Sequence, residues 1–80
     1  IMQLYLKEYT GQWTYVTEVK DMSQAEEWAR NCFKDYDDGV LKRTITGVVV
    51  QGNMIYLYYD IVVAKDGNTF KVKVVLKVTE

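Results

Sequence analysis

Apolar and polar side chains alternate in residues 2–8, with the period of a β-strand that buries one face. Thr10-Gly11 then predicts a tight turn, because glycine adopts backbone conformations that other residues avoid. Residues 13–19 repeat the alternation, and pairing across the turn sets Leu6 beside Tyr15. The amino-terminal segment therefore predicts a β-hairpin.

The next segment changes to the spacing of a helix. Ser23-Gln24-Ala25-Glu26 has the sequence of a capping box, in which the serine hydroxyl and the glutamate satisfy amides of the first turn. Apolar residues then follow one helix face: Ala25, Trp28, Ala29, Cys32, Phe33 and Tyr36. Asp37-Asp38-Gly39 predicts the end of the helix, since glycine suits the left-handed capping position. Cys32 is expected to be a small buried residue of the apolar face.

Three long apolar-rich segments follow, at residues 41–51, 54–64 and 69–79. The dipeptides between them, Gly52-Asn53 and Asp66-Gly67, are signals of two-residue hairpin turns. Together with the first hairpin, these segments give the element order ββαβββ.

The two turns also predict a strand register. Gly52-Asn53 pairs Val48 with Leu57, and Asp66-Gly67 pairs Leu57 with Leu76. Leu57 falls on the same face in both hairpins, an agreement that a one-residue slip would destroy. We therefore expect residues 1–80 to form a single α+β domain with two layers, one helix packed on an antiparallel sheet.

The sheet face that points away from the helix is the main candidate site. Its predicted members are Ile45, Val49, Tyr56, Tyr58, Asp60, Val62, Lys71, Lys73 and Val75. A solvated face of an antiparallel sheet is ordinarily polar, whereas this one is mixed. One interpretation is a solvated face whose β-branched and aromatic residues serve strand propensity, with lysine stems lying over them.

The other interpretation is a contact surface for another protein or for a second copy of the chain. Tyrosine is favoured at such surfaces, and contiguous exposed apolar patches often mark them. Tyr56 and Tyr58 would form the centre, with the lysines and Asp60 at the rim. A nucleic-acid platform of stacked tyrosines and lysines is a third possibility. The sequence leaves open whether the amino-terminal hairpin extends the sheet at its edge or folds over this face.

Composition narrows the function classes. The chain has no histidine, which removes the usual general base and zinc ligand, so we expect no enzymatic activity, metal or cofactor. A net charge of −1 argues against a general nucleic-acid binder. The single cysteine excludes an internal disulfide and favours a reducing, cytoplasmic location. No apolar run approaches the roughly 18 residues of a membrane span, so no membrane partner is expected.

Residues 24–79 resemble the cystatin fold, plant-type cystatins in particular. "AEEWARNCFKDY" resembles their long helix, and "VVVQGNMIYLYYDIVVAKDGNTFKVKVVLKV" their central hairpin and following strands. The resemblance implies that residues 48–52 occupy the place of the family's Gln-x-Val-x-Gly loop, which enters the cleft of papain-like proteases. Here Val48 stands at the glutamine position, and the Pro-Trp second loop is missing. An alternative site follows at Gln51, Gly52 and Asn53.

As a class, the chain also resembles the small α+β proteins that phages encode to inhibit host defence enzymes. We therefore expect a small non-enzymatic protein that acts by steric occupation of a partner protein's surface, with a host enzyme as the implied partner. The alternatives are a cystatin-like inhibitor of cysteine proteases, a homodimeric structural module and a nucleic-acid-binding module.

Overall fold

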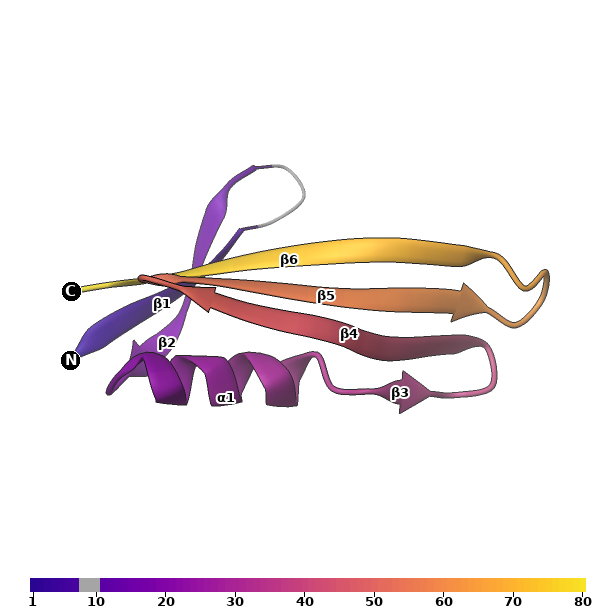
Figure 1. Ribbon diagram of the computed structural model, residues 1–80, viewed down its shortest axis with the longest axis horizontal. Helices are drawn as coiled ribbons and strands as arrows, with labels where there is room; N and C mark the ends of the chain where they lie inside the picture. Colours follow the sequence, from indigo (N-terminus) through magenta and orange to yellow (C-terminus); the bar gives the residue numbers. More distant parts are fainter. Residues whose placement is uncertain (8–10) are drawn as a thin grey trace.

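One antiparallel sheet dominates the computed structural model, which describes residues 1–7 and 11–80 (Figure 1). Its strands are hydrogen-bonded in the order β2-β1-β6-β5-β4-β3. Their bounds are β1 (Met2–Lys7), β2 (Trp13–Val19), β3 (Tyr36–Asp37), β4 (Leu41–Gln51), β5 (Met54–Val63) and β6 (Thr69–Thr79). Helix α1 (Met22–Cys32) lies between β2 and β3 in the chain. Within the described ranges, no helix combines the length and the hydropathy needed to cross a membrane.

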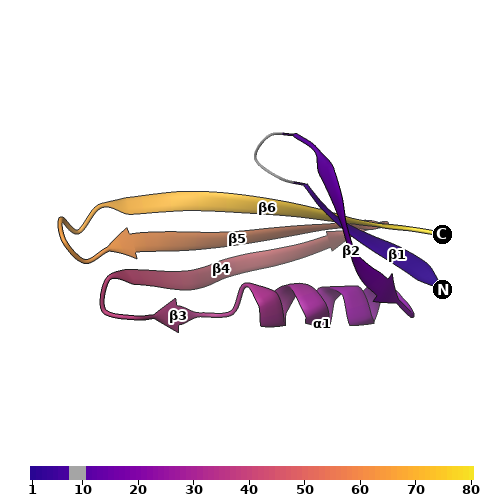
Figure 2. The same cartoon turned by 180° about the vertical axis from the view of Figure 1, so that it is seen from behind.

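The predicted two-layer α+β architecture is wrong. The sheet curls into a half-barrel, and the protein is mostly β, with 11 of its 80 residues in the helix. A helix of that length spans about 16 Å, whereas a strand of the same length spans about 36 Å. Helix α1 runs beside β4, its first turn next to the end of β2, and it does not form a layer over the whole sheet (Figures 1 and 2).

The helix ends before Tyr36, its predicted last apolar residue, and a contact between Lys34 and Arg43 of β4 accounts for this. The helix stops at Cys32, and the amide of its C-cap Phe33 donates to the carbonyl of Ala29 at 3.0 Å. Beyond the helix, Arg43 binds the carbonyl of Lys34: its Nε and Nη2 donate to Lys34 O at 3.1 and 2.9 Å. These bonds hold the chain in an extended conformation, and Tyr36 becomes part of the short strand β3.

The N-terminal cap of α1 lies two residues before the predicted Ser23. Asp21 is the N-cap, and its Oδ1 accepts a hydrogen bond from the amide of Gln24 at 2.8 Å. The Gln24 side chain accepts one from the amide of Lys20 at 2.6 Å. The cap therefore works by the predicted logic of reciprocal side-chain bonds, with different residues.

Cys32 is exposed, so its predicted burial is wrong. Ala25 and Ala29 are the helix residues that are fully buried, and Met22 and Trp28 pack against the core while partly exposed. Cys32 is the last residue of the helix and lies beyond these contacts.

The core fills the inside of the curl. Its buried residues are Leu4, Val19, Ala25, Ala29, Ile55, Leu57, Leu76 and Val78. We call the sheet face that carries Leu57 and Leu76 the inner face, and the opposite face, which carries Tyr56 and Tyr58, the outer face.

The β4–β5 register is as predicted in its first part, with Val48 opposite Leu57. A β-bulge between Ile45 and Gly47 then shifts the pairing by one residue. At the bulge the amide of Ile45 donates to Oδ1 of Asp35 at 2.8 Å, a bond that the sequence pattern does not reveal.

The predicted β5–β6 register is wrong by two residues, because Leu57 pairs with Val74 and not with Leu76. The connection is longer than a two-residue turn. The Val63 amide donates to Asn68 O at 2.9 Å, and the Gly67 amide donates to Val63 O at 2.8 Å. A shift of two residues keeps every side chain on its predicted face, since side chains alternate with a period of two.

The amino-terminal hairpin extends the sheet at its edge. Residues 3–6 of β1 pair with residues 76–79 of β6. Thr10 of the predicted turn lies outside the described residues, and Gly11 has the positive φ of 87° that a turn glycine adopts. A bulge after Leu4 places Leu6 opposite Thr14, not Tyr15. The outer face of β4, β5 and β6 is therefore not covered by this hairpin.

Candidate functional site

The outer face of β4, β5 and β6 brings together eight of the nine predicted contact residues. They are Val49, Tyr56, Tyr58, Asp60, Val62, Lys71, Lys73 and Val75. The placement of Ile45 on this face is wrong. The bulge that follows it turns its side chain to the inner face, where it pairs with Tyr59 and packs against the core.

Tyr58 lies at the centre of this surface. It pairs with Gly47 on one side and Lys73 on the other. A Cβ placed on Gly47 would meet the Tyr58 ring at 3.9 Å, so the missing side chain leaves one edge of the ring open. The tyrosine is 37% exposed. In the next row, Tyr56 lies between Val49 and Val75. The centre of the face is therefore aromatic and aliphatic.

Two lysines of β6 border this centre and differ in their contacts. Lys71 Nζ lies 3.6 Å from Asp60 Oδ1, across the strand pair. Lys73 Nζ lies 5.4 Å from the centroid of the Tyr56 ring, within the range of a cation–π interaction. Among the described residues no carboxylate lies in ion-pair range of Lys73. Asp60 is thus paired with Lys71, while Lys73 lies over an aromatic ring.

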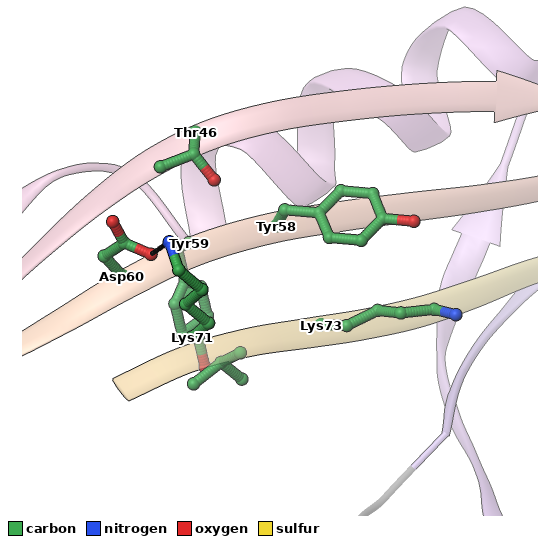
Figure 3. Close-up of a pocket in the computed structure, with 7 residues that line it drawn as sticks. Thr46, Tyr58, Tyr59, Asp60, Lys71 and Lys73 are labelled. Atoms are coloured by element: carbon green, nitrogen blue, oxygen red, sulfur yellow. Dashed lines mark ion pairs between the residues drawn. The ribbon is translucent and has the colours of Figure 1, made fainter. Parts of the chain in front are cut away.

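A shallow hollow of about 160 Å³ lies on the outer face, lined in part by Lys71, Lys73 and Asp60. Figure 3 shows Tyr58 and Lys73 lying side by side along one flank, with the Lys71–Asp60 ion pair at the end. Its lining residues are Thr46, Tyr58, Tyr59, Asp60, Lys71, Val72 and Lys73. The outer face therefore has relief and is not a flat sheet surface.

The outer face continues across β1 and β2 in a lysine–aromatic cluster that sequence reasoning missed. Lys77 Nζ lies 4.4 Å from the ring centroid of Trp13 and 5.6 Å from that of Tyr5. Lys7 pairs with Trp13 across β1 and β2, and its Nζ lies 5.7 Å from the centroid of the Trp13 ring. The rings of Tyr5 and Tyr15 meet edge to face at 5.7 Å. The alternation of β1 already put Tyr5 and Lys7 on one side, but the sequence did not show that β1 pairs with β6.

The charges of the chain are segregated in space, although the net charge is only −1. On the outer face, β1, β5 and β6 contribute a single carboxylate, Asp60, and it is paired. The same three strands contribute four lysines to that face: Lys7, Lys71, Lys73 and Lys77. Carboxylates instead gather on α1 and around β3, at Glu26, Glu27, Asp35, Asp37 and Asp38. These three strands therefore give the outer face a basic region, with Lys42 of β4 beside it and the carboxylates Glu18 of β2 and Asp37 of β3 at the two edges of the sheet.

The alternative loop forms the predicted two-residue turn between β4 and β5. Gln51, Gly52 and Asn53 are all exposed, and Gly52 has a φ of 59°. Asn53 is tied to the neighbouring strand: its Nδ2 donates to Val78 O at 3.1 Å, and its carbonyl accepts from the Val78 amide at 2.9 Å. The turn is therefore hydrogen-bonded to β6, and its insertion into a protease cleft stays a prediction.

The aspartates around β3 hold a turn. Asp38 Oδ1 accepts hydrogen bonds from the amides of Val40 and Leu41, both at 2.8 Å, and its Oδ2 accepts one from the Tyr36 hydroxyl at 2.9 Å. The two amide bonds, with the tyrosine bond, lower the pKa of Asp38. The bond to Asp38 raises the pKa of the Tyr36 hydroxyl. No group of three or more potential metal ligands occurs within residues 1–7 and 11–80.

This carboxylate predicts a specific pH dependence. Because its pKa is lower in the folded than in the unfolded chain, Asp38 stabilises the fold above the ordinary value of 3.8. That contribution disappears as the pH falls through the folded-state pKa. Asp38→Asn keeps the oxygen acceptor and cannot titrate, so its melting temperature should fall less between pH 6 and pH 2 than that of the wild type. Glu27→Gln, at an exposed carboxylate of α1, is the control. Identical acid sensitivity of the Asp38→Asn variant and the wild type would contradict this assignment.

No protein-family model, curated protein or solved structure matches the chain. The cystatin and phage-inhibitor resemblances therefore stay predictions, and the geometry of the outer face alone supports an interpretation.

The arrangement suits binding. Tyr56, Tyr58 and the neighbouring valines offer apolar area to a partner, and the lysines around them offer point charges. Such a surface complements a macromolecule whose own contact area is apolar at its centre and anionic at its edge.

Proposed function

We propose that this protein is a non-enzymatic binding module whose outer face occupies a surface on a larger protein and blocks it sterically. Inhibition of an enzyme, such as a host defence enzyme, follows where the covered surface includes that enzyme's active site. The observation that carries the proposal is the solvent-open row around Tyr58, apolar at its centre and bordered by Lys73 and the Lys71–Asp60 pair.

An apolar centre with a charged border is the usual arrangement of protein–protein interfaces, and this supports a protein partner. Binding energy at interfaces concentrates in a few central residues, among which tyrosine is enriched, inside a polar rim. The lysines of the outer face, Lys7, Lys42, Lys71, Lys73 and Lys77, favour a partner surface that carries carboxylates, because charge complementarity steers association and excludes wrong partners. The acidic α1 side of the molecule would repel the same surface.

The aromatic rings favour a protein over single-stranded nucleic acid. Bases stack on open ring faces, whereas the rings of Tyr5, Trp13 and Tyr56 each have a lysine of this chain over them. Val49 and Val75, on either side of Tyr56, add aliphatic area that contributes to protein contacts but not to stacking.

The test is affinity capture from cells that naturally make the protein, followed by a binding measurement on the captured partner. Tyr58→Ala should weaken binding by about 1–3 kcal/mol, roughly 5- to 150-fold, because it removes a central aromatic side chain. The melting temperature should stay close to that of the wild type. Isothermal titration calorimetry with the purified partner gives the affinity.

Two adjacent valines of β4 provide a matched control. Val49 and Val50 have similar exposure, 50% and 42%, and lie on the outer and inner face respectively. Val49→Ser should weaken the complex and Val50→Ser should not. A complex that survives Tyr58→Ala and Val49→Ser unchanged would remove the outer face as the binding site. A complex that nuclease treatment dissolves would replace the protein partner with nucleic acid.

A further inference from the structure

The inner face of the sheet is covered along only part of its length. At the end near the chain termini, beside α1, Ile55, Leu57 and Leu76 are completely buried. Towards the β5–β6 connection the same face opens to solvent: Phe70 is 54% exposed and Leu41 is 39% exposed. Figures 1 and 2 show the reason, since α1 ends about midway along β4 and only the two-residue strand β3 follows it.

The uncovered end carries a continuous set of apolar side chains. We call it the distal inner patch, and it consists of Leu41, Ile61, Val63, Phe70 and Val72. Leu41 pairs with Val63, and Ile61 pairs with Phe70, so the patch spans three neighbouring strands. Ile61, Val63 and Val72 are only half-buried, although strand alternation gives them the same orientation as the core. Exposed apolar groups of this kind mark interaction sites.

The five residues of the distal inner patch are all uncharged. Arg43, which pairs with Ile61, brings one positive charge to the edge of the patch, and its guanidinium is directed toward Lys34 O and the ring of Tyr36. The rim carries both signs, with Lys65 next to Asp66 in the β5–β6 connection. A surface that is neutral at its centre and mixed at its rim can face a copy of itself without repulsion. On the outer face of β1, β5 and β6 the lysines outnumber the carboxylates, so two copies facing each other there would bring like charges together.

We propose that the distal inner patch is a homodimer interface in which the patches of two copies of this chain pack face to face. A two-fold axis makes the same residues meet from both sides. Two curled sheets can then interdigitate their inner side chains at the usual spacing of about 10 Å. The interface is small, so association is reversible and depends on concentration.

This inference goes beyond the proposed function and does not depend on it. In the dimer the outer faces of both copies point away from the interface, so each dimer presents two partner-binding faces. Linked sites of this kind raise the apparent affinity for a partner that is itself multivalent.

The test is sedimentation velocity of the protein alone, over concentrations from about 1 to 300 µM, a range suited to a weak dimer. The wild type should shift from the mass of one chain to that of two. Phe70→Glu should stay at the mass of one chain throughout, because a carboxylate would be buried at the interface without a partner. Tyr58→Glu, which places the same charge on the outer face, should dimerise like the wild type.

Leu41→Glu, on another strand of the patch, is a second variant in case Phe70→Glu does not fold, and circular dichroism establishes folding for each. Concentration-dependent amide shifts in the NMR spectrum of the wild type locate the contact without any substitution. They should appear at residues 61–63 and 70–72 and not at Tyr58. A wild type that stays monomeric at every concentration would overturn the proposal. So would folded patch variants that still dimerise, or a Tyr58→Glu variant that does not.

Discussion

Leu57→Ala should lower the free energy of unfolding by about 2–5 kcal/mol, the range for truncating a buried leucine. Leu57 is fully buried on the inner face, with Val48 and Val74 as its strand neighbours. The loss combines the transfer of the leucine side chain with the cavity that it leaves. For a domain of this size, whose total stability is of order 4–12 kcal/mol, the variant will be close to unfolding. Urea denaturation measures the change.

The adjacent position on the same strand is the control. Tyr58 points to the outer face, so Tyr58→Ala should cost no more than about 1 kcal/mol, as is usual for exposed positions. A comparable loss for both variants would contradict the division of β5 into an inner and an outer face.

Arg43→Ala should lower the free energy of unfolding by about 2–4 kcal/mol, from charge-assisted hydrogen bonds and cation–π contacts. The guanidinium donates to Lys34 O and holds the chain after the helix. Its Cζ lies 5.7 Å from the ring centroid of Tyr59 and 5.9 Å from those of Phe33 and Tyr36. Phe33 and Tyr59 also stack, at 6.0 Å. Removing Arg43 therefore loosens the segment between α1 and β4.

Arg43→Lys separates charge from geometry. Lysine keeps the positive charge but loses the planar fork that donates from two nitrogens, so it should recover only part of the stability. Hydrogen exchange should show faster opening of residues 33–38 in both variants, with the Leu57 amide still protected. Full recovery by lysine, or unchanged exchange in that segment, would show that Arg43 does not organise it.

The parts of the fold that the sequence predicts correctly depend on neighbouring residues. Gly52-Asn53 sets the β4–β5 turn locally, and the alternation that follows from it gives Val48 opposite Leu57. The faces of β5 and β6 are also predicted correctly, although the register is two residues off, because a shift of two leaves each side chain on its side.

The errors in the helix end and in the placement of Ile45 involve contacts between residues nine and ten apart in the chain, whereas the β5–β6 register error comes from the length of the local connection. Apolar spacing continues through Phe33 to Tyr36, but bonds from Arg43 to Lys34 O and the pairing of β3 with β4 hold this segment outside the helix. At the bulge that turns Ile45 inward, the Ile45 amide is bonded to Asp35, ten residues earlier. A shorter helix covers less of the sheet, so the two-layer prediction fails and the distal inner patch is left open.

The sequence predicts the residues at the centre of the outer face but not those at its edge on β1 and β2. Tyr56 and Tyr58 follow from strand alternation alone. The cluster of Trp13, Tyr5 and Lys77 requires β1 to pair with β6, which joins the first and last strands of the chain. Alternation says which face a residue takes, but not which strands become neighbours.

Site-specific photo-crosslinking tests the central claim, that the outer face binds a foreign protein, most directly. Tyr58→p-benzoylphenylalanine places a photoreactive ring at the centre of the outer face, and Phe70→p-benzoylphenylalanine places the same group on the inner face of β6. After irradiation in the cells that naturally make the protein, the account predicts an adduct with a different protein from position 58 only. The same foreign adduct from position 70 and none from position 58 would contradict it.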